Sequence, residues 1–158
     1  EKNLISERKK KLENISEFSQ VYPNKVIKSD TTRSLINTCS NEDKKSLEEK
    51  NILTNICGRV MTIREMGNSV FADLHDEYGK IQIYLNKKNL DEISQNMFKN
   101  LDLGDIVGIS GIIFKTKTQE LTINVDSFLI LSKCLRPLPE KFHGIADIEI
   151  KYRQRYLD

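Results

Sequence analysis

The chain has 158 residues, of which 38% are hydrophobic, and it carries 25 basic and 23 acidic side chains. This length and apolar content suit one modest domain with appendages and exclude two separate cores. No apolar run approaches membrane-spanning length. The net charge of +2 argues against binding that is driven mainly by long-range attraction to a nucleic-acid backbone.

The first 51 residues predict an appendage of three short helices. Residues 6–20 are predicted as the first helix, with Ser6 as its N-cap. The two threonines at 31–32 introduce the second, and the polar run at 40–43 caps the third, over residues 44–50. Few apolar residues occur in this part, so we expect it to be accessory to the core.

A basic run lies inside the first predicted helix. Arg8 and Lys9 belong to this run, which extends to Lys11. Such a run is typical of a solvated helix face, and it is also a candidate for contact with a phosphate backbone.

From residue 52 onward the pattern changes to strands. The first predicted strand covers 56–64, with Gly58 at a bulge or bend. After a turn at 66–68, two alternating runs at 69–75 and 80–85 flank residues 76–79. This pattern predicts a hairpin in which Gly79 is free to adopt a positive φ.

The alternation divides the hairpin into two faces. One face is aliphatic and is expected to point into the core; it comprises Val70, Ala72, Leu74, Ile81, Ile83 and Leu85. This register places Phe71 on the outer face beside Gln82. An exposed aromatic ring next to a side-chain amide can hold and read an unstacked base. Alternation alone leaves open that a loop or a partner domain covers Phe71.

One helix and two strands are predicted after the hairpin. The helix covers 90–101, and its apolar stripe comprises Leu90, Ile93, Met97, Phe98 and Leu101. The strand at 106–115 contains two glycines, at 108 and 111, and is expected to be strongly bent. The last strand covers 120–131; Leu121, Ile123 and Val125 are expected to face inward, and Glu120, Thr122, Asn124 and Asp126 outward.

Three strands, a helix and two strands form the element order of the OB-fold, a mostly β, five-stranded Greek-key barrel. We therefore predict a helical appendage at 1–51, an OB-fold at 52–135 and a linker at 136–158. OB-folds bind their ligands over strands two and three, which is where Phe71 and Gln82 lie.

The three cysteines and two histidines predict neither a metal site nor a catalytic set. Cys39, Cys57 and Cys134 are widely separated and form no CxxC motif, which favours inert thiols in a reducing compartment. His75 and His143 lack metal-ligand spacing. We expect no catalytic residue and no metal ligand in this segment.

Several motifs resemble class II lysyl-tRNA synthetases of the bacterial type. The resemblance runs from about residue 12 to residue 158. The matching segments are GRVMTIREMG at 58–67, FADLHDEYGKIQIYL at 71–85, LGDIVGISG at 103–111, FKTKTQEL at 114–121, LRPLPEKFHG at 135–144 and YRQRYLD at 152–158. Aspartyl and asparaginyl relatives share the barrel and a run similar to YRQRYLD, but not the KFHG stretch.

The resemblance implies roles for individual residues. Phe71 would stack on the central base of the lysine anticodon, and Gln82 and Arg64 would hydrogen-bond this uracil. Glu120 would contact a neighbouring anticodon base. Two further candidates for contact with the tRNA backbone are Lys115 and Lys117.

The chain departs from the family near Glu120. Family members often have Thr-Gly-Glu where this chain has Thr118-Gln119-Glu120. A residue other than glycine at 119 is expected to affect the conformation of this loop, and with it the position of Glu120.

The resemblance implies that this segment is the anticodon-binding part of a lysine–tRNA ligase, whose catalytic motifs lie beyond residue 158. The segment itself would need no cofactor, whereas the full ligase would use ATP and Mg²⁺ and would form a homodimer without contacting a membrane. The chain begins at Glu1 and not at Met, which suggests a piece of a longer protein. The expected compartment is the cytoplasm or an organelle of bacterial origin.

Three alternatives remain open at this stage. The chain could be the anticodon domain of an aspartyl or asparaginyl relative. It could be a general single-strand-binding OB module, which should bind any sequence with a steep salt dependence. It could also be an interaction platform in which protein covers Phe71.

Overall fold

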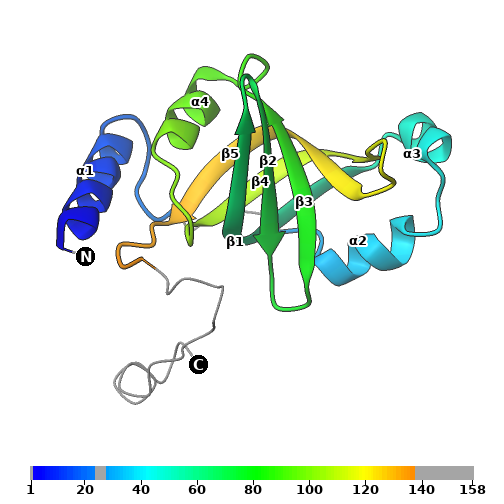
Figure 1. Cartoon of the computed structure of the whole chain (residues 1–158), viewed down its shortest axis with the longest axis horizontal. Helices are drawn as coiled ribbons and strands as arrows, with labels where there is room; N and C mark the ends of the chain where they lie inside the picture. The colour runs from blue at the N-terminus through cyan, green and yellow to red at the C-terminus, as the bar shows by residue number, and fades with distance from the viewer. Residues whose placement is uncertain (1, 24–27, 138–158) are drawn as a thin grey trace.

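Within residues 2–23 and 28–137, which the computed structural model describes, five strands form a closed barrel (Figure 1). The strand order around the barrel is β1-β2-β3-β5-β4. Neighbouring strands are antiparallel except for β3 and β5, which pair in parallel. The strands are β1 (Leu53–Met66), β2 (Ser69–His75), β3 (Lys80–Asn86), β4 (Ile106–Lys115) and β5 (Leu121–Ser132). This arrangement confirms the predicted OB-fold.

The barrel interior is filled by the aliphatic residues that the alternation assigns to it. The six inward residues of the hairpin are at most 4% exposed. Ile123 and Val125 of β5 are buried as predicted, whereas Leu121 is partly exposed. The inward face of a half-buried strand is therefore readable from the sequence alone.

Two glycines allow a close approach of neighbouring strands. A Cβ at Gly111 would lie 2.1 Å from the carbonyl oxygen of Asn124, beside a register shift between β4 and β5. This confirms the predicted bend of β4. A Cβ at Gly58 would lie 2.7 Å from the carbonyl oxygen of His75. The bulge predicted at Gly58 is instead between Val60 and Thr62, where the pairing of β1 with β2 shifts.

The turns of the first three strands differ in part from the prediction. Gly67, between β1 and β2, has a φ of +63° and is the first central residue of a two-residue hairpin loop. Gly79 does not adopt the positive φ expected of it. The β2–β3 turn is held instead by the side chain of Asp76, which accepts hydrogen bonds from the backbone N–H groups of Tyr78 and Gly79.

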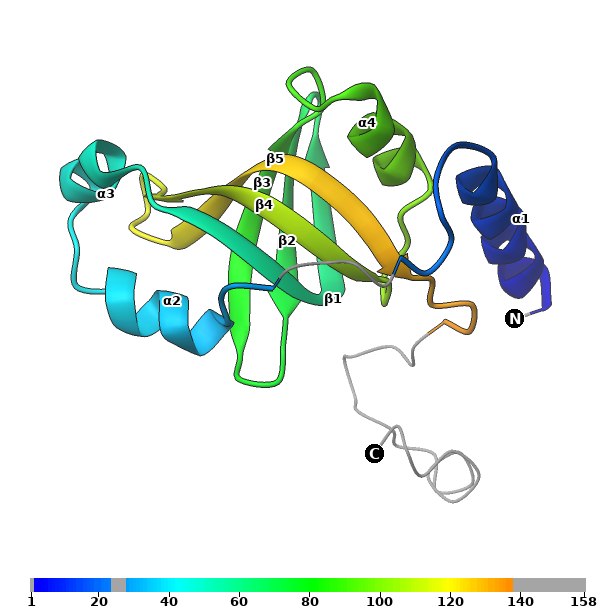
Figure 2. The ribbon, with the colours of Figure 1, turned by 180° about the vertical axis from the view of Figure 1, so that it is seen from behind.

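The N-terminal helices α1 (Lys2–Phe18), α2 (Thr32–Cys39) and α3 (Lys44–Lys50) lie outside the barrel, and α1 is on the side opposite to α2 and α3 (Figures 1 and 2). The helix α1 begins four residues before the prediction, so Ser6 lies inside it and is not the N-cap. None of residues 2–5 is a helix breaker, which allows the extension.

Both other N-terminal helices begin where the sequence predicts. The side chain of Thr31 accepts a hydrogen bond from Ser34 N, and Thr31 N donates to Ser34 Oγ, which together form a capping box. Asp43 caps α3 by accepting from Ser46 N at 2.8 Å. The helices also contribute to the core, since Leu35 and Leu47 are buried.

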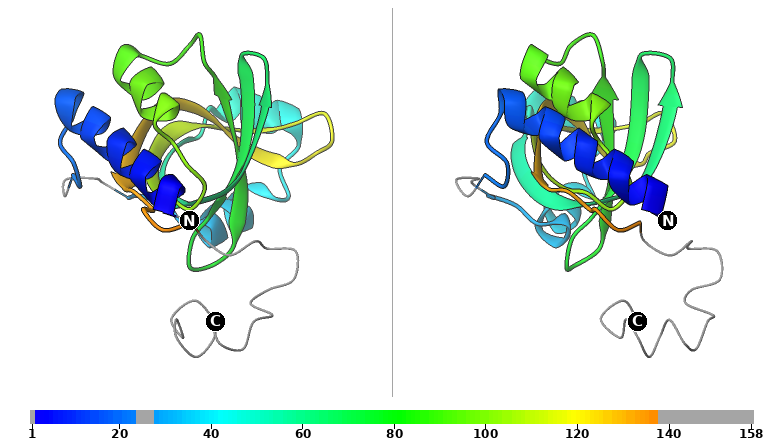
Figure 3. Two further views of the ribbon diagram at one scale, coloured as in Figure 1. Left: turned by 60° about the vertical axis from the view of Figure 1, so that its left-hand side comes forward. Right: turned by 90° about the vertical axis from the view of Figure 1, so that its left-hand side faces the viewer.

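The fourth helix, α4 (Glu92–Lys99), connects β3 to β4 and lies beside α1 (Figure 3). Met97 is fully buried, and the Phe98 ring packs edge-on against Phe128 of β5. Ile93 was predicted in the buried stripe but is 51% exposed. The buried residues of α4 are Ser94 and Met97, so its buried face is turned away from Ile93.

The tail of the chain is described only as far as residue 137. The predicted linker, including the KFHG and YRQRYLD motifs, lies otherwise outside the described residues. Among the helices that are described, none combines the length and the apolar character that crossing a bilayer requires.

Candidate nucleic-acid interface

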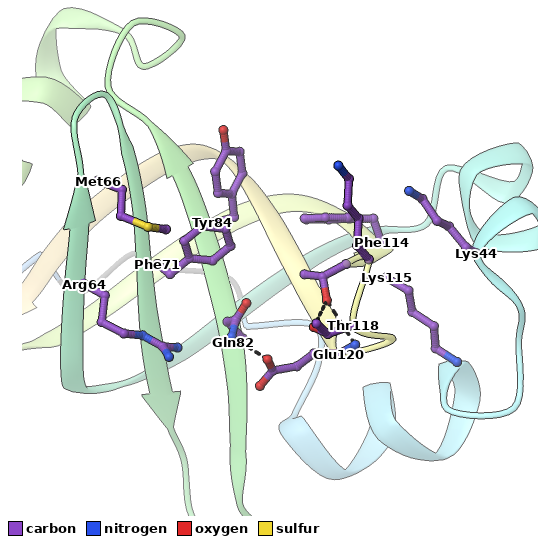
Figure 4. A pocket seen from close by; sticks show the side chains of 12 residues that line it. Lys44, Arg64, Met66, Phe71, Gln82, Tyr84, Phe114, Lys115, Thr118 and Glu120 are labelled. Atoms are coloured by element: carbon purple, nitrogen blue, oxygen red, sulfur yellow. Dashed lines mark hydrogen bonds between the residues drawn. The ribbon is translucent and has the colours of Figure 1, made fainter.

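A pocket of about 680 Å³ opens over the outer face of the first three strands, beside the β4–β5 turn (Figure 4). It brings together six of the eight predicted contact residues, which are Arg64, Phe71, Gln82, Lys115, Lys117 and Glu120. Arg8 and Lys9 lie on α1 and do not line it.

The two residues on α1 have different environments. Arg8 donates a hydrogen bond from Nη1 to the backbone carbonyl of Cys134, so its guanidinium holds α1 against the end of β5. Lys9 is exposed. A role for either of them in contacting RNA stays a prediction.

Three aromatic rings form one wall of the pocket. Phe71 directly faces Tyr84 in the β2–β3 register, with ring centroids 5.0 Å apart. Phe114 of β4 meets Tyr84 edge-on at 6.3 Å. The prediction placed Phe71 beside Gln82, but Gln82 pairs with Asp73, which is two residues after Phe71 on β2. Phe71 and Gln82 are therefore diagonal neighbours on the same face, and both line the pocket.

Gln82 is more enclosed than predicted, with only 7% of its surface exposed. Its Nε2 donates to Glu120 Oε2 at 2.7 Å, and its Oε1 accepts from Thr122 Oγ1 at 3.3 Å. Thr122 belongs to β5 and stands opposite Gln82 in the parallel pairing with β3, whereas Glu120 precedes β5 in the β4–β5 turn. Thr122, predicted to face outward to solvent, is fully buried because it lies beneath this contact.

The β4–β5 turn places Glu120 at the edge of the pocket. Gln119 N donates to Thr116 O, Thr116 N donates to Glu120 O, and Glu120 N donates to Thr116 Oγ1. Gln119 has a φ of +64°, in the left-handed region that favours glycine. The loop therefore keeps a glycine-like conformation although residue 119 is glutamine, and Glu120 reaches Gln82.

Arg64 and Lys117 present charge to the pocket from opposite sides of it. The Arg64 side chain is 59% exposed, and its nearest acidic atom is Asp73 Oδ1, 3.8 Å from Nη2. At this distance and exposure the ion pair is weak, so the guanidinium can donate to a ligand. Lys117 is exposed on the turn.

Lys115 has a structural role that the sequence does not indicate. It is 9% exposed, and its Nζ donates to the carbonyl oxygens of Ser40 at 2.8 Å and Glu42 at 2.6 Å. These bonds fix the α2–α3 connection against β4. Its predicted contact with the tRNA backbone would compete with them.

The pocket is locally cationic although the barrel segment is nearly neutral. Lys44, Arg64, Lys115 and Lys117 line it, against Glu120 as its single carboxylate among the described residues. Lys44 comes from α3 and points toward the pocket from the side opposite β1 (Figure 4). Lys44 was not predicted, because nothing in the local sequence links a lysine of the appendage to the barrel.

Tyr84 and Phe114 were also missed as pocket residues. Alternation places Tyr84 on the outer face, and this signal was available. The strand that carries Phe114 is apolar on both faces, so alternation does not distinguish the side of its ring.

Two of the thiols, Cys39 and Cys57, have surroundings that lower their reactivity. Burial raises the pKa of the Cys39 thiol, and neighbouring Glu42 and Asp30 add to the effect. Burial likewise raises the pKa of Cys57. Both thiols are therefore protonated and unreactive at neutral pH. Within the described part of the chain, no three His, Cys, Asp or Glu side chains gather as a metal site would require.

Comparison with known proteins places this geometry in a family. Residues 54–131 match the tRNA anticodon family model, described as an OB-fold nucleic acid binding domain. The whole chain is similar to proteins named lysine–tRNA ligase. It is 44% identical to that of Haemophilus influenzae over 96% of this chain, and 43% identical to that of Methylobacillus flagellatus over its full length. The relative from Halalkalibacterium halodurans is 42% identical over 99% of this chain.

The chain spans 30% to 31% of the length of these three relatives. Its barrel, its helix between β3 and β4 and its pocket all lie in the region of similarity. Residues 54–131 thus match the OB-fold nucleic acid binding family, and the chain as a whole is similar to about a third of the length of lysine–tRNA ligases.

Proposed function

We propose that this chain is the part of a lysine–tRNA ligase that recognises the anticodon. The observation that carries the proposal is the joint placement of the Phe71 ring, the Gln82 amide and the Arg64 guanidinium in one pocket. A ring can stack on a base, and an amide and a guanidinium can hydrogen-bond its edge. The names of the relatives support a tRNA for lysine as the ligand.

Each residue has a distinct task in this proposal. Phe71 stacks on the central uracil of the anticodon, and Tyr84 supports its ring at 5.0 Å. Gln82 and Arg64 hydrogen-bond the edge of that base. Lys44 and Lys117 neutralise the phosphates on either side, which keeps the electrostatic contribution small and local.

The complete ligase would attach lysine to its tRNA at the expense of ATP, with Mg²⁺ and as a homodimer. We assign ATP, Mg²⁺ and the attachment of lysine to the rest of the complete ligase and not to this part. In the relatives, we expect the residues for these steps to lie outside the 30% to 31% of their length that this chain matches. The proposed division is an appendage at 1–51, the barrel at 52–135 and a linker at 136–158, and the proposed compartment is the cytoplasm or an organelle of bacterial origin.

A binding panel tests the proposal. Fluorescently labelled anticodon stem-loops for lysine (UUU), aspartate (GUC) and asparagine (GUU) are titrated with the 158-residue chain, beside an unstructured C-rich RNA. We expect the UUU loop to bind most tightly, with a shallow salt slope of about −2 in the logarithmic plot.

The panel also distinguishes the alternatives. Tightest binding of GUC or GUU would assign the chain to an aspartyl or asparaginyl type. Equal binding of the C-rich RNA with a steep salt slope would identify a general single-strand module. Absence of binding to every RNA would favour a protein-interaction platform.

A further inference from the structure

The hydrogen bonds of Gln82 determine the orientation of its amide. An ionised carboxylate can only accept hydrogen bonds, so the amide nitrogen, and not the amide oxygen, must face Glu120. The 2.7 Å separation of Gln82 Nε2 and Glu120 Oε2 is that of a charge-assisted hydrogen bond. Turning the amide over would place two oxygens against each other, and Gln82 is only 7% exposed, although Glu120 itself is exposed.

Thr122 does not impose this orientation. Its hydroxyl can donate to the amide oxygen at 3.3 Å, and it can equally accept from an amide nitrogen in the same place. In the second case its hydrogen would turn to Glu120 O, 3.1 Å away. The orientation of Gln82 is therefore set by the carboxylate of Glu120.

The oriented amide keeps hydrogen-bonding capacity for a ligand. The nitrogen carries two hydrogens and the oxygen two lone pairs. Within the described residues, Glu120 uses one hydrogen and Thr122 one lone pair. One donor and one acceptor remain, on a side chain that lines the pocket (Figure 4).

The orientation matters because an amide that rotates freely cannot distinguish uracil from cytosine. Uracil presents a donor at N3 and an acceptor at O4, whereas cytosine presents an acceptor at N3 and a donor at N4. Rotating an amide by half a turn exchanges its donor and acceptor, and so converts the match for one base into the match for the other. An amide held in one orientation accepts one base and opposes the other.

We propose that Glu120 is a positioning residue that holds the Gln82 amide in the orientation that accepts uracil and rejects cytosine. This inference rests on the proposed function, because it assumes that Gln82 reads a pyrimidine. It gives one oxygen of Glu120 a task within the protein. The other oxygen, Oε1, remains for the base contact that the family resemblance implies.

The test compares the wild-type chain with Glu120→Gln on two stem-loops, UUU and UCU. The variant is almost isosteric, but its own amide can meet Gln82 with either a donor or an acceptor. Both orientations of Gln82 then become satisfied. We expect wild type to prefer UUU by more than about tenfold, since a good bidentate contact discriminates by roughly 1–3 kcal/mol.

In Glu120→Gln this preference should fall by about tenfold, mainly because UCU binds more tightly. The readout is this ratio, because a contact of Glu120 Oε1 with a neighbouring base, which UUU and UCU share, would change both affinities by the same factor. Some preference should remain, since Arg64 can only donate and matches O4 of uracil better than the amine of cytosine.

Glu65→Gln is the matched control. It removes the same charge from the same barrel, but Glu65 pairs with Lys87 and does not line the pocket. A general electrostatic effect would appear in both variants, whereas a change in the UUU-to-UCU ratio should appear in Glu120→Gln alone. Thermal unfolding of each variant confirms that it is folded.

The possible results distinguish failure of the proposed function from failure of the positioning role of Glu120. If wild type binds neither loop, or binds both alike, the proposed function fails and the positioning role with it. If wild type prefers UUU and Glu120→Gln keeps the same ratio, the positioning role alone is refuted. Equal weakening of both loops in Glu120→Gln would also refute it.

Discussion

Two clusters of buried polar side chains on the barrel, around Lys133 and around Gln82, use their hydrogen-bonding capacity differently. At the end beside α1, Lys133 is enclosed by Asn100, Asp102 and Asp105. Its ammonium group has three hydrogens and meets three acceptors, so nothing is left over. Gln82, in the pocket, uses only part of its capacity.

This difference separates a structural cluster from a candidate site. The Lys133 and Asp105 side chains are both 0% exposed, and Asp105 also accepts from the backbone N–H of Asp102 and Cys134. That cluster joins the start of β4 to the end of β5. Gln82 and Thr122 are also buried, but their partner Glu120 is exposed, and Gln82, which has a donor and an acceptor left, lines a pocket. Burial of a polar side chain therefore indicates a binding site only when some of its hydrogen-bond donors or acceptors remain unused within the protein.

The largest expected effect is on the Lys133 cluster. Lys133→Met leaves Asp105 buried without its cation, and should lower the free energy of unfolding by about 3–5 kcal/mol. Urea unfolding followed by circular dichroism measures the change. Lys11→Met removes a partner of Asp102 that is 34% exposed, and should cost less than about 1 kcal/mol. Similar losses of unfolding free energy in both variants would mean that burial of the Lys133 cluster does not increase its contribution to stability.

The pocket should respond in binding. Phe71→Ala removes the stacking ring, and should weaken binding of both the UUU and the UCU loop by about 1–3 kcal/mol. Because stacking is tolerant of sequence, the ratio of the two affinities should not change. Tyr78→Ala is the control, since Tyr78 is 45% exposed on the β2–β3 turn, outside the pocket. Unchanged binding in Phe71→Ala would contradict the claim that the Phe71 ring stacks on a base.

A smaller effect is expected at the junction of α2 with the β2–β3 turn. Burial raises the pKa of Asp76, but hydrogen bonds from Thr32, Tyr78 and Gly79 outweigh it and hold the pKa below its ordinary value of 3.8. A carboxylate with a lowered folded-state pKa stabilises the fold above its unfolded pKa, and this stabilisation is lost as pH falls through the folded pKa.

Asp76→Asn should therefore cost about 1–2 kcal/mol at neutral pH. The difference from wild type should stay constant above about pH 5 and shrink as the pH falls below 3.8. Urea unfolding at a series of pH values measures it. A difference that does not depend on pH would show that the charge of Asp76 does not contribute.

The smallest effect is expected at Gln119. Gln119→Gly relieves a left-handed conformation, and should raise the free energy of unfolding by up to about 1 kcal/mol. Gln119→Ala keeps the strain and should show no gain. The same unfolding measurement compares them. A loss of stability in Gln119→Gly would mean that the Gln119 side chain stabilises the turn.

Much of the fold could be predicted from local patterns. Alternation assigned the inward residues of β2 and β3, and the caps at Thr31 and Asp43 are short-range chemistry that a sequence displays directly. The first residue of a helix is less well determined by the sequence, since α1 begins four residues before the predicted start.

The candidate site was predictable only in part, because its decisive contacts come from distant segments. Period 2 places Gln82 on the outer face, but does not reveal its hydrogen bonds to Glu120 of the β4–β5 turn and to Thr122 of β5, which pairs in parallel with β3. For the same reason the roles of two lysines were not predicted. Lys115 hydrogen-bonds the α2–α3 connection, and Lys44 reaches the pocket from the appendage.

The most direct test of the pocket is the side-chain amide signal of Gln82 in a ¹⁵N–¹H spectrum of the 158-residue chain, assigned with a Gln82→Asn variant. The account predicts that adding the UUU stem-loop shifts this pair of resonances, and that the same amount of UCU stem-loop leaves it nearly in place. A Gln82 signal that stays unmoved by a saturating amount of the UUU loop would contradict the claim that this amide reads the anticodon.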